Sequence, residues 1–100
     1  METQLPKTTY YKDEDFILEL QWHEGQIFLH CEVSNWKLSS LKRMYSVFKS
    51  LLTEVKNLEV DRLITITPNP KFAKLFGGTV ISDFEYENTN YEVIIWEWTQ

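Results

Sequence analysis

Acidic residues near the C-terminus are the groups whose type and spacing best suit acid–base catalysis. Asp83, Glu85, Glu87 and Glu92 follow one another closely, and a carboxylate acts as a general base when it lies beside the proton to be removed. Alternating acids along a strand pair are more typical of a solvated face, where they also deter pairing between sheet edges. We therefore assign no catalytic residue and interpret Asp83 and Glu85 as part of a partner-binding surface.

Cysteine and histidine are too sparse to indicate a metal site or a thiol enzyme. Cys31 is the single cysteine, so the chain cannot form an internal disulfide. Its place in an apolar alternation predicts a small buried hydrophobe. His23 and His30 lack the accompanying cysteines of a zinc site, and neither a Ser-His-Asp order nor a glycine-rich phosphate loop is evident. The sequence predicts no metal and no cofactor.

A basic strip lies in the middle third of the chain. Lys42 and Arg43 fall on one long amphipathic segment, and Lys37 and Ser39 stand at its start, where a helix dipole favours an anion. Lys37 and Ser39 therefore form a weak candidate anion site, and Trp36 beside them is a candidate partner-binding residue. The alternative interpretation of the strip is a solvated helix face.

The composition predicts one acidic domain with an aromatic-rich core. The chain has 100 residues, of which 43% are apolar and 15% aromatic, and this is enough to build a single core. The formal net charge is −5: residues 1–34 hold seven acids and two bases, residues 35–80 three acids and eight bases, and residues 81–100 five acids and no base. Overall acidity argues against broad nucleic-acid binding, although the basic strip keeps an oligonucleotide binder open as an alternative.

No segment has the character of a secretion signal or a membrane span. Residues 1–16 contain no apolar run, and no stretch reaches the length of about 18 apolar residues that a spanning helix needs. We expect a cytoplasmic protein without membrane contact, located in the host cytoplasm if a phage encodes it.

The hydrophobic pattern predicts a single α/β (α+β) domain over residues 15–100, after a polar arm at residues 1–14 in which residues 8–11 are a candidate edge strand. Period-two alternation around a turn indicates a strand hairpin, and apolar residues at i, i+3 and i+4 indicate an amphipathic helix. The predicted elements are a hairpin at 16–33, a long helix at 35–59, a strand at 62–67, a short helix at 69–76 and a second hairpin at 79–98. This order, β-β-α-β-α-β-β, favours a mixed, mostly antiparallel sheet.

Local signals predict where both helices start and stop. Ser34 or Asn35 suits the cap of the long helix, and Asn69 suits the cap of the short one, because their side chains accept a free backbone N–H. Gly77 or Gly78 is expected to end the short helix with a positive φ. The long helix is expected to bury an apolar stripe of Leu38, Leu41, Tyr45, Phe48, Leu52 and Val55, which Met44 and Leu51 widen.

The order of elements from Ile27 to Trp98 resembles the C-terminal half of the GCN5-related N-acetyltransferase (GNAT) fold. That half runs strand, long helix, strand, short helix and two antiparallel strands, and NPKFAKLFGG at residues 69–78 looks like its short second helix and the glycine that follows. The resemblance implies a GNAT-like C-terminal topology and, in full family members, a site for acetyl-coenzyme A. The chain is most similar to shortened members of the phage type.

Two family motifs are missing from this chain. The coenzyme A loop of the family, Arg/Gln-x-x-Gly-x-Gly/Ala, brings backbone N–H groups against a pyrophosphate at the helix N-terminus. Residues 34–41 read SNWKLSSL, with no glycine and with the bulk of Trp36. The position of the general-acid tyrosine of many members falls on Ala73. The resemblance therefore implies a member that lacks the cofactor loop and the proton donor.

The last strand supplies the other candidate contact residues. Residues 93–96 are apolar on both faces, and tryptophan is enriched among the residues that dominate interface energies. If one face is buried, Ile94, Trp96 and Trp98 on the other face are free to bind a partner or a second copy of the chain. The alternative is that the long helix covers this face, which would make all three core residues.

The sequence favours a non-catalytic, acidic interaction protein with a degenerate acetyltransferase-like fold. Its small size, its missing cofactor loop and its resemblance to phage proteins suggest an accessory protein that binds or inhibits a host protein. The alternative is a divergent N-acyltransferase that uses acetyl-coenzyme A. Enzymatic activity stays open on the sequence alone, and the expected partner is a protein rather than a nucleic acid.

Overall fold

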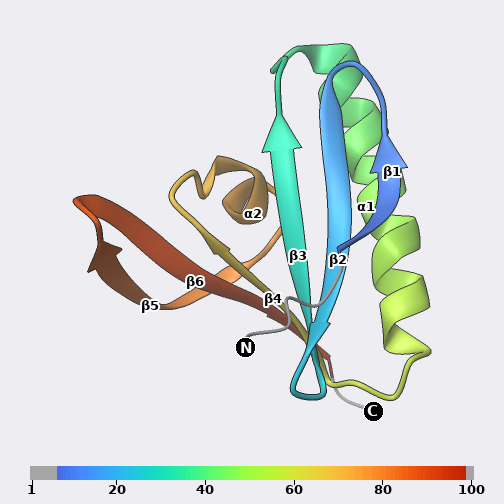
Figure 1. The fold of residues 1–100 in the computed structure, drawn as a ribbon. Coiled ribbons are helices and arrows are strands. Elements are labelled where there is room, and N and C mark those ends of the chain that lie inside the picture. The colour runs from blue at the N-terminus through green and yellow to red at the C-terminus, as the bar shows by residue number, and fades with distance from the viewer. Residues whose placement is uncertain (1–6, 99–100) are drawn as a thin grey trace.

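The computed structural model describes residues 7–98 as one six-stranded sheet with two helices (Figure 1). The elements in chain order are β1 (Thr8–Lys12), β2 (Phe16–His23), β3 (Gln26–Val33), α1 (Leu38–Lys56), β4 (Arg62–Thr67), α2 (Lys71–Leu75), β5 (Thr79–Tyr86) and β6 (Thr89–Glu97). The strands lie in the order β1-β2-β3-β4-β6-β5. Among residues 7–98 only β3 and β4 pair in parallel, so the predicted α+β class and its mixed, mostly antiparallel sheet are confirmed.

The predicted element order lacks one strand at the N-terminus. β1 pairs with β2, with Thr8 opposite Leu20 and Lys12 opposite Ile17, although these residues lie in the segment interpreted as a polar arm. Tyr10 and Tyr11 pack half-buried against the core, and burial of their rings stabilises a strand whose other residues are polar. Residues 1–6 of the arm lie outside the described residues.

Both predicted hairpins are confirmed, together with the alternation that indicated them. In the first hairpin Phe16, Leu18, Ile27 and Leu29 are buried in the same cluster as the residues of α1. β4 lies between β3 and β6, and β6 lies between β4 and β5. A strand with neighbours on both sides is screened from water more completely than an edge strand, which explains why these two are apolar on both faces.

The long helix buries a face that is rotated from the predicted one. Its buried residues are Ser40, Met44, Phe48, Leu51 and Val55. Leu38 and Tyr45, which were expected in the core, are 69% and 53% exposed. The hydrophobic period does not fix this rotation, because apolar side chains occupy a wide arc around the helix. The buried Ser40 hydroxyl donates to Asp15 Oδ2 at 3.2 Å, and this contact turns the first turn of α1 towards the N-terminal strands.

The predicted caps of α1 are wrong. The helix begins after Lys37, which makes no side-chain cap hydrogen bond. The Ser34 backbone N–H donates to the Asp15 carbonyl at 2.7 Å, and Asn35 Nδ2 donates to Asp15 Oδ1 at 2.9 Å. These groups are therefore used in a tertiary contact with a residue about twenty positions earlier in the chain, which local sequence signals do not reveal.

The predicted residue does not cap the short helix either, but the predicted glycine at its C-terminal end is confirmed. α2 begins after Pro70 and has no side-chain cap, so the assignment of Asn69 as its cap is wrong. Gly77 has a φ of 87°, a conformation that favours glycine at the end of a helix. A Cβ atom on Gly78 would collide with the side chain of Ile94, so this glycine lets the chain pass close to β6. Residues 69–78 thus serve packing.

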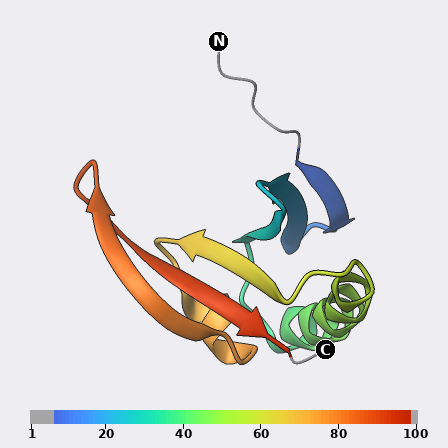
Figure 2. The ribbon, with the colours of Figure 1, turned by 90° about the horizontal axis from the view of Figure 1, so that it is seen from below.

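Both helices cover one face of the sheet, as Figure 2 shows from below. The buried cluster joins Phe48 of α1, Phe72 of α2 and Trp96 of β6, and we term this side the helix face. Ile64 and Ile95 are paired across β4 and β6 and lie outside that cluster. They belong to the opposite side of the sheet, which we term the helix-free face.

Candidate functional site

A cavity lies on the helix face where the two parallel strands diverge. β3 and β4 are in register only at Ile27 with Leu63 and Phe28 with Ile64, and beyond these pairs the strands separate (Figure 1). The space that opens has a volume of about 820 Å³ and is lined by residues 31–34 and Trp36, by Thr65 and Thr67 of β4, and by residues 69–74. A volume of this size is within the range of small-molecule sites.

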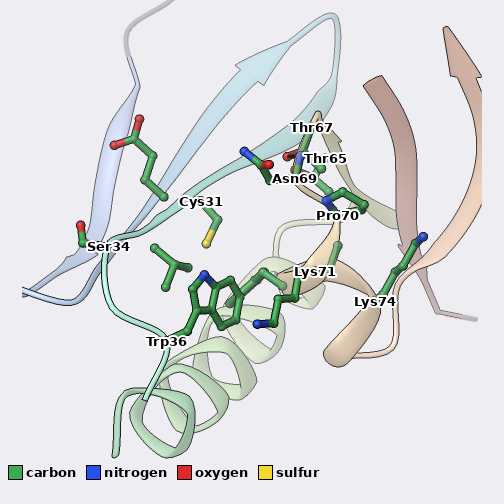
Figure 3. Close-up of a pocket in the computed structure, with 13 residues that line it drawn as sticks. Cys31, Ser34, Trp36, Thr65, Thr67, Asn69, Pro70, Lys71 and Lys74 are labelled. Atoms are coloured by element: carbon green, nitrogen blue, oxygen red, sulfur yellow. Dashed lines mark hydrogen bonds between the residues drawn. The ribbon is translucent and has the colours of Figure 1, made fainter. Parts of the chain in front are cut away.

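Lys71, Lys74 and Thr65, three of the polar residues that line this cavity (Figure 3), have partners within the protein. Lys71 Nζ lies 4.3 Å from the centre of the Trp36 ring, a cation–π contact. Lys74 Nζ lies 3.3 Å from a carboxylate oxygen of Glu92, and Thr65 Oγ1 donates to the Leu29 carbonyl at 2.8 Å. These contacts hold the walls of the cavity together and leave its floor mostly apolar.

The cavity contains no evident nucleophile. Burial raises the pKa of the Cys31 thiol to about 12, so the thiol stays protonated near neutral pH and is a poor nucleophile. Within residues 7–98, no group of three or more histidine, cysteine or acidic side chains is arranged to hold a metal ion. In the same range no helix combines the length and the apolar character that a membrane crossing needs.

A carboxylate of the protein itself occupies the head of α1. The Asp15 side chain is 2% exposed and receives hydrogen bonds from Asn35, from Ser40 and from the Arg43 guanidinium. The Lys37 ammonium lies 3.7 Å away. These contacts, led by the Arg43 hydrogen bond, lower the pKa of the Asp15 carboxyl despite the opposing effect of desolvation. A charge placed here also benefits from the positive end of the helix dipole.

A second acid completes this group, which we term the Asp15 junction (Asp13, Asp15, Asn35, Lys37, Ser40 and Arg43). Desolvation acts to raise the pKa of the Asp13 carboxyl, but hydrogen bonds from the Asp15 backbone N–H and from Arg43 lower it to about 2. Arg43 Nε donates to Asp13 Oδ2 at 3.0 Å, and the Tyr11 hydroxyl donates to the same oxygen at 2.9 Å. The junction therefore joins β1, β2 and α1.

The groups of the predicted weak anion site are already paired within the protein. Lys37 is paired with Asp15, and the carbonyl of Ser39 accepts a hydrogen bond from Arg43 at 3.5 Å. A diphosphate placed at the head of α1 would meet the buried Asp15 carboxylate, so the residues present do not fit the pyrophosphate of coenzyme A at that position. The same pairing removes Lys37 and Arg43 from the basic strip considered for nucleic acid.

Three of the predicted contact residues lie inside the protein. Ile94 and Trp96 are buried, and Trp98 packs against the core. Trp96 Nε1 donates to the Phe76 carbonyl at 3.0 Å and Trp98 Nε1 donates to the Val60 carbonyl at 2.8 Å. The face of β6 that was expected to be free is covered by the helices, so the prediction that these residues meet a partner is wrong.

The other predicted contact residues are exposed but do not form one site. Asp83 and Glu85 lie on β5, where all eight residues are exposed. Trp36 is exposed beside the cavity and carries Lys71 on its ring. β5 and β6 project away from the rest of the sheet as a curved hairpin (Figures 1 and 2), and no contact between Trp36 and either acid is found among the described residues.

Sequence reasoning missed the Asp15 junction and the apolar residues of β5. The signal for the junction was DEDF at residues 13–16, where two acids precede a strand and Asp13 Oδ1 accepts hydrogen bonds from the backbone N–H groups of Asp15 and Phe16. An Asp that bonds the backbone two residues on is typical of a turn. Its pairing with Arg43 on a distant helix could not be read from the local pattern.

Family models, curated proteins and solved structures were all compared with this chain, and none of the three comparisons gives a match.

Proposed function

We propose that this protein is a non-catalytic interaction protein whose contact surface is the β5–β6 hairpin. The observation that carries the proposal is the exposure of large apolar side chains along β5. Val80, Ile81, Phe84 and Tyr86 are 42%, 52%, 43% and 60% exposed. Scattered exposed apolar residues are ordinary, whereas several on one strand mark a surface that meets a partner.

The charge of the hairpin supports a protein partner with a basic surface. Residues 81–100 hold five acids and no base. Complementary charges speed association and select partners, and their effect weakens as salt is added. The aromatic rings of Phe84 and Tyr91 stack at 5.5 Å between centroids, which presents a rigid apolar surface on the same hairpin as these acids. Aromatic residues of this kind often dominate interface energies.

Three features favour a non-catalytic role. The head of α1, where the GNAT family binds a pyrophosphate, is filled by Asp15, and the cavity thiol has a raised pKa. The position matching the family's general-acid tyrosine is the buried Ala73. A degenerate GNAT-like fold, acting as a phage accessory protein that binds or inhibits a host protein, is the form of this proposal that agrees with the sequence resemblance.

The experiment is capture of partners from the producing cells on immobilised protein, with matched variants. The double variant F84S/Y86S removes two exposed rings from the hairpin. The control L38S/L58S removes two exposed apolar side chains from α1 and the loop after it. We expect a protein that is retained by wild type and by the control but lost with the hairpin variant. Equal capture by all three proteins would contradict the proposal.

The cavity favours one second candidate, a divergent N-acyltransferase that uses acetyl-coenzyme A. Its volume of about 820 Å³ and its position between diverging parallel strands suit a small ligand, and Lys71 supplies a cation at its rim. Calorimetry with acetyl-coenzyme A separates the candidates. Micromolar binding that Lys71→Glu abolishes and Lys42→Glu preserves would support the enzyme, and a flat titration is the result we expect.

A further inference from the structure

The outer edge of β5 is the longest unpaired strand edge in the described part of the chain. β5 is the terminal strand of the sheet and spans eight residues, against five for β1 at the other end. Within residues 7–98, β6 is the sole strand that pairs with it. Alternate residues of such a strand direct their backbone N–H and C=O groups outwards, which makes the edge a template for another strand.

The two faces of this edge differ in chemistry. Glu92 contacts Lys74 of α2, so Asp83, which pairs opposite Glu92, lies on the helix face, and so does Glu85 two residues later. Phe84 and Tyr86 lie between and beyond these acids and therefore face the helix-free side. The side chains of β5 thus present carboxylates on one face and aromatic rings on the other.

We propose that β5 binds an extended segment of a partner protein as a seventh strand, and that this segment alternates basic and apolar residues. Cross-strand neighbours share a face, so every second side chain of the added strand meets the carboxylates of Asp83 and Glu85. The side chains between them meet the rings of Phe84 and Tyr86. This inference rests on the proposed function and names the partner class and the mode of binding at the same surface.

A second copy of the chain is a poor occupant of this edge. Two β5 strands placed side by side would bring two acidic strands together, and like charges at cross-strand positions are destabilising. Lys74 and Arg62 are basic side chains that contact β6, and they already pair with Glu92 and Glu97. The charge of the edge therefore selects a basic strand over self-association.

The probe is a synthetic ten-residue peptide of alternating lysine and valine, acetylated and amidated at its ends. Fluorescence anisotropy with the full chain measures its dissociation constant. We expect binding that weakens with added salt and that D83N/E85Q weakens by roughly 2- to 30-fold, as expected for two cross-strand pairs. The control E24Q/E59Q, which removes two exposed acids outside the hairpin, should leave the constant unchanged.

Backbone methylation tests the mode of binding independently of charge. In an extended strand the N–H groups that point to one edge belong to alternate residues, so they belong either to all the lysines or to all the valines. One of two peptides, methylated on every lysine nitrogen or on every valine nitrogen, should lose binding while the other keeps it. Equal behaviour of the two peptides would overturn strand addition, and so would equal binding of a peptide with five lysines followed by five valines.

Failure of this inference is distinguishable from failure of the proposed function. If the peptides do not bind but F84S/Y86S still abolishes partner capture, the hairpin is an interaction surface and strand addition is wrong. If neither readout depends on the hairpin, both proposals fall. Sedimentation that shows a dimer of the wild-type chain, dissociated by F84S/Y86S, would replace the basic segment with a second copy and would overturn the inference.

Discussion

The two edge strands of the sheet differ in how well their unpaired edges are protected from pairing with another strand. β1 is short, contains an irregularity in register between Thr9 and Tyr11, and ends in Lys12. Its tyrosines pack against the core. β5 is longer, and each of its residues is exposed. Short length, bulges and lysine are the devices by which proteins protect an edge from further pairing, so β1 is protected where β5 is not.

The difference indicates that the β5 edge is available for binding. β5 also has an irregularity, between Val80 and Ser82, but five residues of regular pairing, Ser82 to Tyr86, follow it up to the turn. Its acids deter pairing with another copy of the same acidic strand without blocking a basic strand. The end of the sheet that is built into the core maintains the fold, and the end that projects from it is free to meet a partner.

Truncating one phenylalanine at each end of the sheet should give the largest difference in unfolding free energy. Phe16 is 1% exposed and stacks on Tyr11 at 5.0 Å, so Phe16→Ala should cost about 3–5 kcal/mol of unfolding free energy. Phe84 is exposed and stacks only on Tyr91 among its ring contacts, so Phe84→Ala should cost about 1 kcal/mol or less. Urea unfolding measures both values. Equal losses would show that the β5–β6 hairpin contributes to the core as much as the β1–β2 end of the sheet does.

Adding a methyl group at Gly78, directly before β5, should have the next largest effect on stability. A Cβ on Gly78 would meet the side chain of Ile94 and the Ala73 carbonyl, so Gly78→Ala should destabilise the protein by about 1–3 kcal/mol. Gly25, in the turn between β2 and β3, has a positive φ but open space around it, and Gly25→Ala separates strain from steric overlap. A Gly78→Ala protein as stable as wild type would show that the hairpin moves freely against α2.

The junction at the β1 end should make stability depend on acid pH. The folded pKa of Asp13, at about 2, lies below its ordinary value of 3.8. The unfolded chain therefore binds the proton first, and the stabilisation is complete above about pH 4 and is lost as the pH falls through about 2. Asp13→Asn should flatten the dependence of stability on pH in this range. Midpoints of urea unfolding measured between pH 2 and 6 check this. Glu14→Gln, an exposed neighbour, is the control, and an unchanged curve in Asp13→Asn would exclude the junction as its cause.

Most elements of the fold could be predicted from periodicity, since alternation and helical spacing record which side chains are buried. The candidate edge strand at residues 8–11 is confirmed as β1, but it was left out of the predicted element order because its two half-buried tyrosines do not make a period-two pattern. The rotation of α1 was not predicted either, since a contact between Ser40 and Asp15 fixes it across about twenty-five residues of sequence.

The candidate site was less predictable than the fold, because it depends on which face of β6 the helices cover. Apolar residues occupy both faces of that strand, and alternation alone assigns neither one to the core. Trp96 and Trp98 therefore had two equal interpretations, which their indole hydrogen bonds to Phe76 and Val60 decide. The exposed aromatics of β5 have the same composition as core residues, so only the position of β5 at the end of the sheet distinguishes them.

Exchanging the protective features of the two edges should change binding with almost no change in stability. Ile81 lies at the irregularity of β5, where the register skips it, and it is exposed. Ile81→Lys should alter the unfolding free energy by no more than about 0.5 kcal/mol while weakening binding of the lysine–valine peptide, since a lysine there protects the edge and repels the basic strand. Lys12→Ile removes the corresponding lysine from β1 but leaves its short length and its irregularity, so no second binding site should appear. Anisotropy titrations of both variants check this, and a peptide site gained at β1 would mean that the single lysine, rather than the architecture of the edge, decides which end of the sheet is protected.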